Sequence, residues 1–198
     1  MKVVAFNGSP RKGGNTSQMI QIVLKELEHE GIQTELVEMA GNHLYGCKAC
    51  YACKDKQDQK CIIQNDLCNE YIAKMVEADG IILGSPTYFS NVSSEMKALI
   101  DRAGIVGRAN GDMFKRKIGA AVVAVRRAGA VNTFNSINHF FFIEQMIVPG
   151  SIYWNLGIGR APGEVLEDEE GVETMKVLGK NMAWLLKAVQ RENEKTER

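Results

Sequence analysis

The sequence predicts an α/β fold in which a parallel sheet is covered by helices on both faces. Runs that are apolar at every position recur at residues 3–6, 80–83 and 120–125, as in strands buried on both faces. Segments with apolar residues at helical spacing separate these runs. The length of 198 residues suits one domain of ordinary size.

The expected strands follow in order along the chain. Residues 3–6 run directly into a glycine-rich turn, and residues 32–36 alternate in polarity, which is typical of a strand near a sheet edge. Residues 80–83 and 120–125 are uniformly apolar, and residues 146–148 form a short fifth candidate. Five strands suit the flavodoxin-like order 2-1-3-4-5 better than a six-stranded dinucleotide-binding sheet. We therefore expect a doubly wound, three-layer α/β/α architecture.

Helices are expected between and after these strands. Apolar stripes at helical spacing fall within residues 19–27, 67–76, 96–103, 134–141 and 175–189. Strand and helix alternate without a linker or an internal repeat, which predicts a single domain over residues 1–198. A loop at about residues 40–65 lacks periodicity, and loops of this length are usually functional.

Composition excludes several classes of function. Lys and Arg together number 24, and Asp and Glu together also number 24, so no net charge favours nucleic acid or an anionic membrane. No apolar run approaches the roughly 20 residues that span a bilayer. The first residues do not resemble an export signal, so we expect a cytoplasmic protein with reduced cysteines.

The turn after the first strand has the composition of a phosphate site. Residues 7–17 read NGSPRKGGNTS and lead into the first helix. Glycines permit close backbone approach, Arg11 and Lys12 carry positive charge, and the helix N-terminus adds unpaired amides. The loop lacks the glycine patterns of dinucleotide and nucleoside triphosphate sites. It suits a terminal monophosphate such as that of FMN, and the alternative is a plain helix cap by Asn15 or Thr16.

Two further strand ends should lie at the same edge of the sheet. Residues 84–91, GSPTYFSN, offer two aromatic rings and several hydrogen-bonding groups, which can pack on a flat ring and bond its rim. Arg126 and Arg127 follow the fourth strand and can meet a flavin pyrimidine ring or an anionic nicotinamide cofactor. The alternatives are a turn that fills the core and a solvated charge pair.

Three segments together resemble the NADPH-dependent FMN reductase family: GSPR with NT at 8–16, GSPTY at 84–88 and MKALIDR at 96–102. The resemblance covers nearly the whole chain. It implies an FMN-dependent oxidoreductase or electron-transfer flavoprotein that takes electrons from NAD(P)H, and a homodimer or homotetramer. By position, it assigns the phosphate to Ser9, Arg11, Asn15, Thr16 and Ser17, and the isoalloxazine to Pro86, Thr87, Tyr88 and Phe89.

Four of the five cysteines lie in the loop at about 40–65: Cys47, Cys50, Cys53 and Cys61. This spacing can offer four thiolates to one [4Fe–4S] cluster, and it resembles the iron–sulfur flavoprotein branch of the family. Zinc binding, thiol redox chemistry and simple burial of small side chains fit the same residues. We expect Cys68 to be structural and a cluster to lie near the flavin, because the loop leaves the strand beside the first.

The predicted chemistry is oxidation and reduction carried by a bound flavin, with a small molecule or another protein as redox partner. Flavin chemistry requires no protein acid or base, so we assign no catalytic residue. The alternative is a non-enzymatic redox-sensing or binding module that uses the cysteine loop as a switch. Turnover of NAD(P)H with an artificial acceptor distinguishes the two.

Overall fold

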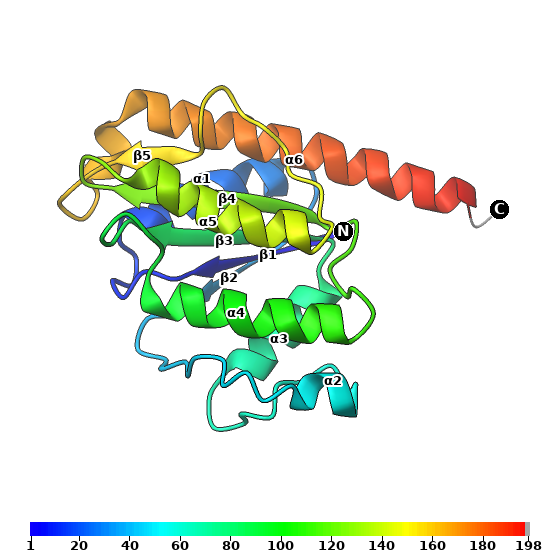
Figure 1. Cartoon of the computed structure of the whole chain (residues 1–198). Helices are drawn as coiled ribbons and strands as arrows, with labels where there is room; N and C mark the ends of the chain where they lie inside the picture. The colour runs from blue at the N-terminus through cyan, green and yellow to red at the C-terminus, as the bar shows by residue number, and fades with distance from the viewer. Residues whose placement is uncertain (197–198) are drawn as a thin grey trace.

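A five-stranded, all-parallel sheet forms the centre of the molecule (Figure 1). The computed structural model describes residues 1–196. The strand order is β2-β1-β3-β4-β5, so the predicted flavodoxin-like order is confirmed. The strands are β1 (Lys2–Asn7), β2 (Gln33–Glu38), β3 (Gly80–Pro86), β4 (Ile118–Val125) and β5 (Leu156–Ile158).

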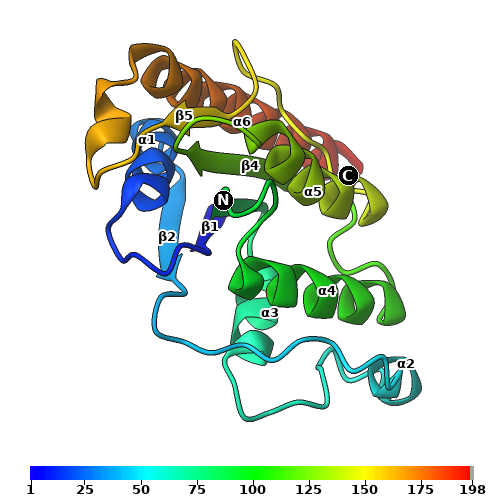
Figure 2. The same cartoon turned by 60° about the vertical axis from the view of Figure 1, so that its left-hand side comes forward.

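Helices cover both faces of this sheet, and Figure 2 shows the layers from a second direction. One face packs against α1 and α6, and the other against α3, α4 and α5. The helical elements are α1 (Asn15–His29), α2 (Ala52–Lys56), α3 (Cys68–Glu77), α4 (Ser94–Ala109), α5 (Ala130–Ile143), the 3-10 helix η1 (Glu164–Glu167) and α6 (Glu169–Thr196). No helix within residues 1–196 is long and apolar enough to cross a membrane.

The central strand β1 shows why the apolar runs are continuous. Val3 and Ala5 are fully buried against the layer of α1 and α6. Val4 and Phe6, which alternate with them, are fully buried in the layer of α3, α4 and α5. A strand with helices on both sides must be apolar at every position, as the sequence predicted. Edge strand β2 has no fully buried position, which agrees with its alternating pattern.

The fifth strand differs from the prediction. Residues 146–148 make only an isolated bridge, in which Ile147 pairs with Ile118. The true β5 spans Leu156–Ile158 and pairs with the end of β4, from Val123 to Val125. Three residues are too few to show a hydrophobic period, so the position of β5 depends on tertiary pairing.

Candidate functional site

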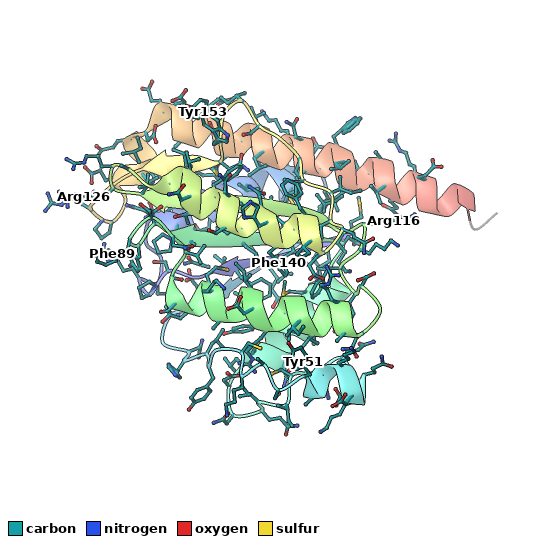
Figure 3. The ribbon with its side chains drawn as sticks, viewed as in Figure 1. Tyr51, Phe89, Arg116, Arg126, Phe140 and Tyr153 are labelled. Atoms are coloured by element: carbon teal, nitrogen blue, oxygen red, sulfur yellow. The ribbon has the colours of Figure 1, made fainter. Side chains whose placement is uncertain are left out.

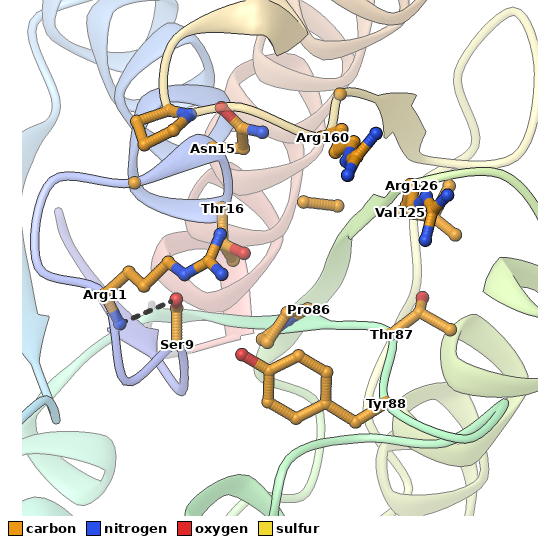
Figure 4. Close-up of a pocket in the computed structure, with 14 residues that line it drawn as sticks. Ser9, Arg11, Asn15, Thr16, Pro86, Thr87, Tyr88, Val125, Arg126 and Arg160 are labelled. Carbon is orange, nitrogen blue, oxygen red and sulfur yellow. Dashed lines mark hydrogen bonds between the residues drawn. The ribbon is translucent and has the colours of Figure 1, made fainter.

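A cavity of about 360 Å³ opens at the carboxyl ends of β1, β3 and β4 (Figure 4). In parallel α/β sheets, ligands bind beyond this edge. Of the ten residues predicted to bind flavin, eight line the cavity: Ser9, Arg11, Asn15, Thr16, Pro86, Thr87, Tyr88 and Arg126. The other two predicted residues, Ser17 and Phe89, do not line this cavity.

The turn between β1 and α1 forms one wall. The Asn7 side chain accepts a hydrogen bond from the Ser9 amide at 3.0 Å, and Ser9 Oγ accepts one from the Arg11 amide at 3.1 Å (Figure 4). Helix α1 begins after Gly14 without a side-chain cap, and its first turn has no acidic residue. The N-terminal amides of α1 therefore retain the capacity to bind an anion.

Asn15 does not cap α1, which contradicts the plain-cap alternative for this residue. Its amide nitrogen donates to the Ala161 carbonyl at 2.9 Å, and its oxygen accepts from the Gly163 amide at 2.8 Å. Asn15 thus fastens the loop before η1 against the start of α1. This contact brings the loop into the wall of the cavity.

Ser17 does not line the cavity, and its predicted contact with a phosphate stays a prediction. Its hydroxyl donates to Glu38 Oε1 at 2.6 Å, and Asn7 Nδ2 of the side chain donates to Glu38 Oε2 at 2.7 Å. Successive helical residues are rotated about 100° from each other, so Ser17 faces β2 while Thr16 faces the cavity. Glu38, at the end of β2, supports the turn from behind.

The turn after β3 forms the opposite wall. The Thr87 amide donates to the Ala124 carbonyl at 2.9 Å, which fixes this turn against β4. Thr87 Oγ1 is buried and has no hydrogen-bond partner among the described residues. A buried hydroxyl without a partner is costly, so a polar ligand atom in the cavity would stabilise it. The ring of Tyr88 reaches toward the same space (Figure 4).

Phe89 also does not line the cavity. Its backbone has φ of 47°, in the left-handed region, and its side chain is fully exposed. In Figure 3 it projects from the molecule on the same side as Arg126. The tight turn closed by the mutual backbone bonds of Tyr88 and Asn91 directs Phe89 away from the cavity.

Arg160 is a cavity residue that the sequence analysis missed. It lies after β5, in the loop that Asn15 holds in place. Glu164 accepts hydrogen bonds from the amides of Ala161 and Arg160, both at 2.6 Å, and these bonds lower the pKa of the Glu164 carboxyl. Because β5 was predicted at residues 146–148, Arg160 was not among the predicted site residues.

A second cavity, of about 270 Å³, is lined by all four cysteines of the long loop. Cys53 and Cys61 are buried, whereas Cys47 and Cys50 are exposed. Burial raises the pKa of the Cys53 thiol, and the nearby Cys61 and Cys47 add to this effect. A wall of the cavity comes from Asp101 and Ile105 of α4, together with Tyr51, Ile62 and Ile63.

The cysteine loop is strained. Ala49, Tyr51, Gln57 and Gln59 adopt left-handed backbone conformations, with φ between 48° and 62°. Such conformations are uncommon outside glycine and gather at ligand sites. Within residues 1–196, no three His, Cys, Asp or Glu side chains are grouped so that they could hold a single metal ion.

The two cavities share no lining residue. The cysteine loop leaves β2 at the carboxyl edge of the sheet, but it then runs along the outer side of α4. Helix α2 lies beyond α4 in both views (Figures 1 and 2). The expectation that the cysteines lie beside the flavin loops is therefore not met within one chain. Helix α4 links the two regions, because Ser93 at its start donates to the Gly8 carbonyl at 2.7 Å.

Cys68 does not line the cysteine cavity. It is fully buried at the start of α3, and burial raises the pKa of its thiol to about 12. A thiol with so high a pKa is not a ready metal ligand or nucleophile. The geometry agrees with its predicted structural role.

Comparisons with known proteins give a consistent picture. The sequence model of the NADPH-dependent FMN reductase family matches residues 1–161. An iron–sulfur flavoprotein of Methanocaldococcus jannaschii is 40% identical over 198 aligned positions, which cover 96% of this chain and 100% of that protein. An iron–sulfur flavoprotein of Methanosarcina thermophila is 36% identical, over 98% of this chain and 100% of that protein.

Solved structures share the fold at low sequence identity. A flavodoxin from the domain Archaea has a TM-score of 0.62 and 19% identity, with 94% of this chain and 99% of that chain covered. An NAD(P)H:quinone oxidoreductase from Methanothermobacter marburgensis has a TM-score of 0.67 and 12% identity, with 92% and 98% covered. At these identities the likeness supports the flavodoxin-like fold alone.

Proposed function

This chain belongs to the NADPH-dependent FMN reductase family, and we propose that one domain holds FMN in the cavity at the ends of β1, β3 and β4. The protein is a flavin-dependent oxidoreductase that uses FMN. The observation that carries this assignment is the convergence of three separate turns on one cavity. The unpartnered Thr87 hydroxyl and the uncapped start of α1 both fit a polar, anionic ligand there.

We assign the two ends of the ligand to different walls. Ser9, Arg11, Thr16 and the first amides of α1 would hold the phosphate, while Asn15 positions the loop that carries Arg160. At the other end, Pro86, Thr87, Tyr88 and Arg126 would contact the isoalloxazine. Bound FMN supplies hydride and single-electron chemistry, and these residues bind and orient it.

NAD(P)H is the proposed electron donor. Arg160 is exposed at the cavity rim and is assigned to neither end of FMN, so its positive charge can face an incoming ligand. Guanidinium groups suit the phosphates of a nicotinamide cofactor. A small molecule or a second protein would then accept the electrons.

The test of this function is spectroscopic. Purified protein reconstituted with FMN should bleach its flavin absorbance when NADPH or NADH is added without oxygen, and it should turn over with an artificial acceptor. A protein that cannot be reconstituted with FMN would lack the proposed site. Bound flavin that neither nicotinamide cofactor reduces would instead show that the donor is wrong. Family membership favours this enzyme over the redox-switch alternative.

We also propose that Cys47, Cys50, Cys53 and Cys61 hold a [4Fe–4S] cluster. The support is the single cavity that all four thiols line and the four-thiolate donor set itself. Anaerobic reconstitution should give about four irons per chain. Cys53→Ala should lower the iron content and leave FMN bound, because the two cavities are separate. Cys68→Ala is the matched control and should retain iron, so equal iron loss in both variants would argue against this ligand set.

A homodimer or homotetramer is the proposed assembly. Large apolar side chains are exposed on the end of α5, on the segment that leads into β5 and on β5 itself: Phe142, Ile143, Ile152, Tyr153, Trp154 and Ile158. Four of them, Phe142, Ile152, Tyr153 and Trp154, line one hollow. Contiguous exposed apolar surface on a globular protein usually marks an interface. A second copy of the chain would remove this surface from water.

A further inference from the structure

Arg102 is a buried arginine on α4 that the flavin site does not use. Its side chain is fully buried. The guanidinium donates to the Tyr45 carbonyl at 3.2 Å, to the Ile63 carbonyl at 3.0 Å and to the Asp66 carboxylate. Its Nε–H points at Cys61 Sγ, at 3.3 Å. A buried charge needs this degree of pairing, so the arrangement is specific to a guanidinium.

These acceptors lie on both sides of the cysteine loop. Tyr45 precedes Cys47, whereas Cys61, Ile63 and Asp66 form the return of the loop toward α3. Asp66 strengthens the closure, because it also accepts the Tyr45 amide at 3.0 Å. One rigid fork from α4 therefore joins the beginning of the loop to its end.

Cys61 is held from a second side. Its amide donates to the Asn69 side chain at 2.8 Å, and Asn69 donates back to the Cys61 carbonyl at 2.9 Å. The backbone of Cys61 is thus fixed by α3, while its sulfur faces both the cysteine cavity and the Arg102 guanidinium. A charged donor on a ligand sulfur stabilises the more negative, reduced form of an iron–sulfur centre.

We propose that Arg102 is the positioning residue of the cysteine site: it closes the loop around the four thiols, and its bond to the Cys61 sulfur raises the reduction potential of the centre that they hold. The proposal rests on the cluster proposed above, but its geometric part also applies to the metal-free protein. It assigns a role to a residue that touches neither the flavin cavity nor the solvent.

Three variants test it. Arg102→Lys keeps the positive charge but loses the fork. The pair Arg102→Gln with Asp66→Asn removes both buried charges together, so that neither is left unpaired. Arg108→Gln is the matched control on the same helix, because Arg108 donates to the Ile143 carbonyl and lines neither cavity.

After anaerobic reconstitution of the full chain, the first two changes should speed iron release to a chelator roughly ten- to a hundredfold, the usual cost of losing a residue that supports a metal ligand. The midpoint potential of the cluster should become more negative, while FMN content stays the same. Arg108→Gln should match the wild type. Unchanged iron release and potential in Arg102→Lys would overturn the proposal, as would equal loss of FMN and iron, which would indicate general unfolding.

Alkylation of the metal-free protein tests whether Arg102 closes the cysteine loop, and this test does not require a bound cluster. In the wild type, iodoacetamide should modify exposed Cys47 well before buried Cys61, as peptide mass spectrometry can measure. Arg102→Lys should remove much of the protection of Cys61. If the wild type binds no iron, the proposed cluster fails, but this measurement still decides the role of Arg102. Unchanged protection of Cys61 would refute the closure.

Discussion

Arg11 and Lys12 are adjacent cations of the β1–α1 turn, but only Arg11 lines the flavin cavity. Arg11→Ala should remove a charge-assisted hydrogen bond to the FMN phosphate, worth about 1.5–3 kcal/mol. FMN affinity should then fall roughly ten- to a hundredfold, as fluorescence titration can measure. Riboflavin, which lacks the phosphate, should bind almost unchanged. Lys12→Ala is the control, and an equal loss in that variant would mean that only the net charge of the turn matters.

Glu144 at the end of α5 is a buried carboxyl whose two oxygens have no hydrogen-bond partner among the described residues. Burial raises its pKa from 4.5 to about 7, while Arg108 opposes the shift and Asp112 adds to it. The folded chain therefore keeps this proton up to about pH 7, whereas the unfolded chain releases it near pH 4.5. Because the unfolded state binds fewer protons in this window, stability falls as the pH rises through it.

Glu144→Gln removes this titration while keeping the shape of the side chain. At pH 8 the free energy of unfolding of the variant should exceed that of the wild type by about 3 kcal/mol at most. At pH 4 the two proteins should differ little in this free energy. Urea denaturation at the two pH values measures the difference. A gain of the same size at both would show that the effect does not come from the proton on Glu144.

Composition predicted which turns line the cavity, but it did not predict where every side chain on them points. Ser9, Arg11 and Thr87 were predicted from the composition of their turns, and they line the cavity. Ser17 and Phe89 belong to the same turns but face Glu38 and solvent. The rotation of a helix and one left-handed φ decide those directions, and neither can be read from composition.

At the scale of elements, α1 and β3 pack in direct contact at Gly84. A Cβ atom there would lie 3.0 Å from Ile20 Cγ1 and 3.2 Å from Thr16 Cγ2, with Ile20 Cδ1 closer still. Gly84→Ala should therefore destabilise the fold by about 1–3 kcal/mol, as chemical denaturation can measure. Gly150→Ala is the control, because a Cβ at that position meets no atom within 4 Å. Equal stability of the two variants would show that α1 can move away from β3 without cost.

The elements that were predicted correctly share a property that β5 lacks. β1, β3 and β4 are buried on both faces, and α1 and α4 each bury a long stripe of apolar side chains. The sequence of each of these elements therefore shows its own pattern of apolar residues. β5 has three residues and α2 has five, which is less than a periodic signal requires. The loop that carries Arg160 depends on β5, so Arg160 was not predicted as part of that wall.

For the whole molecule, the exposed apolar surface around Tyr153 should determine the assembly state. The double variant Tyr153→Ser, Trp154→Ser should shift the protein toward the monomer, because it removes two large apolar side chains that are about half exposed in one chain. Light scattering coupled to gel filtration measures the mass. Tyr51→Ser is the control, since Tyr51 lies on the cysteine loop at the far side of the molecule (Figure 3). A wild-type protein that is already monomeric would refute the proposed interface.

The separation of the two cavities determines how the enzyme would fail in air. Cys47 and Cys50 are exposed, and oxidants react first with accessible sulfur, whereas the flavin turns contain no cysteine. Air should therefore remove iron from the proposed cluster while FMN stays bound. Parallel time courses of iron in the filtrate and flavin in the protein would show this, and simultaneous release would mean that each site depends on the other. Oxygen would then leave a yellow flavoprotein that has lost the proposed cluster.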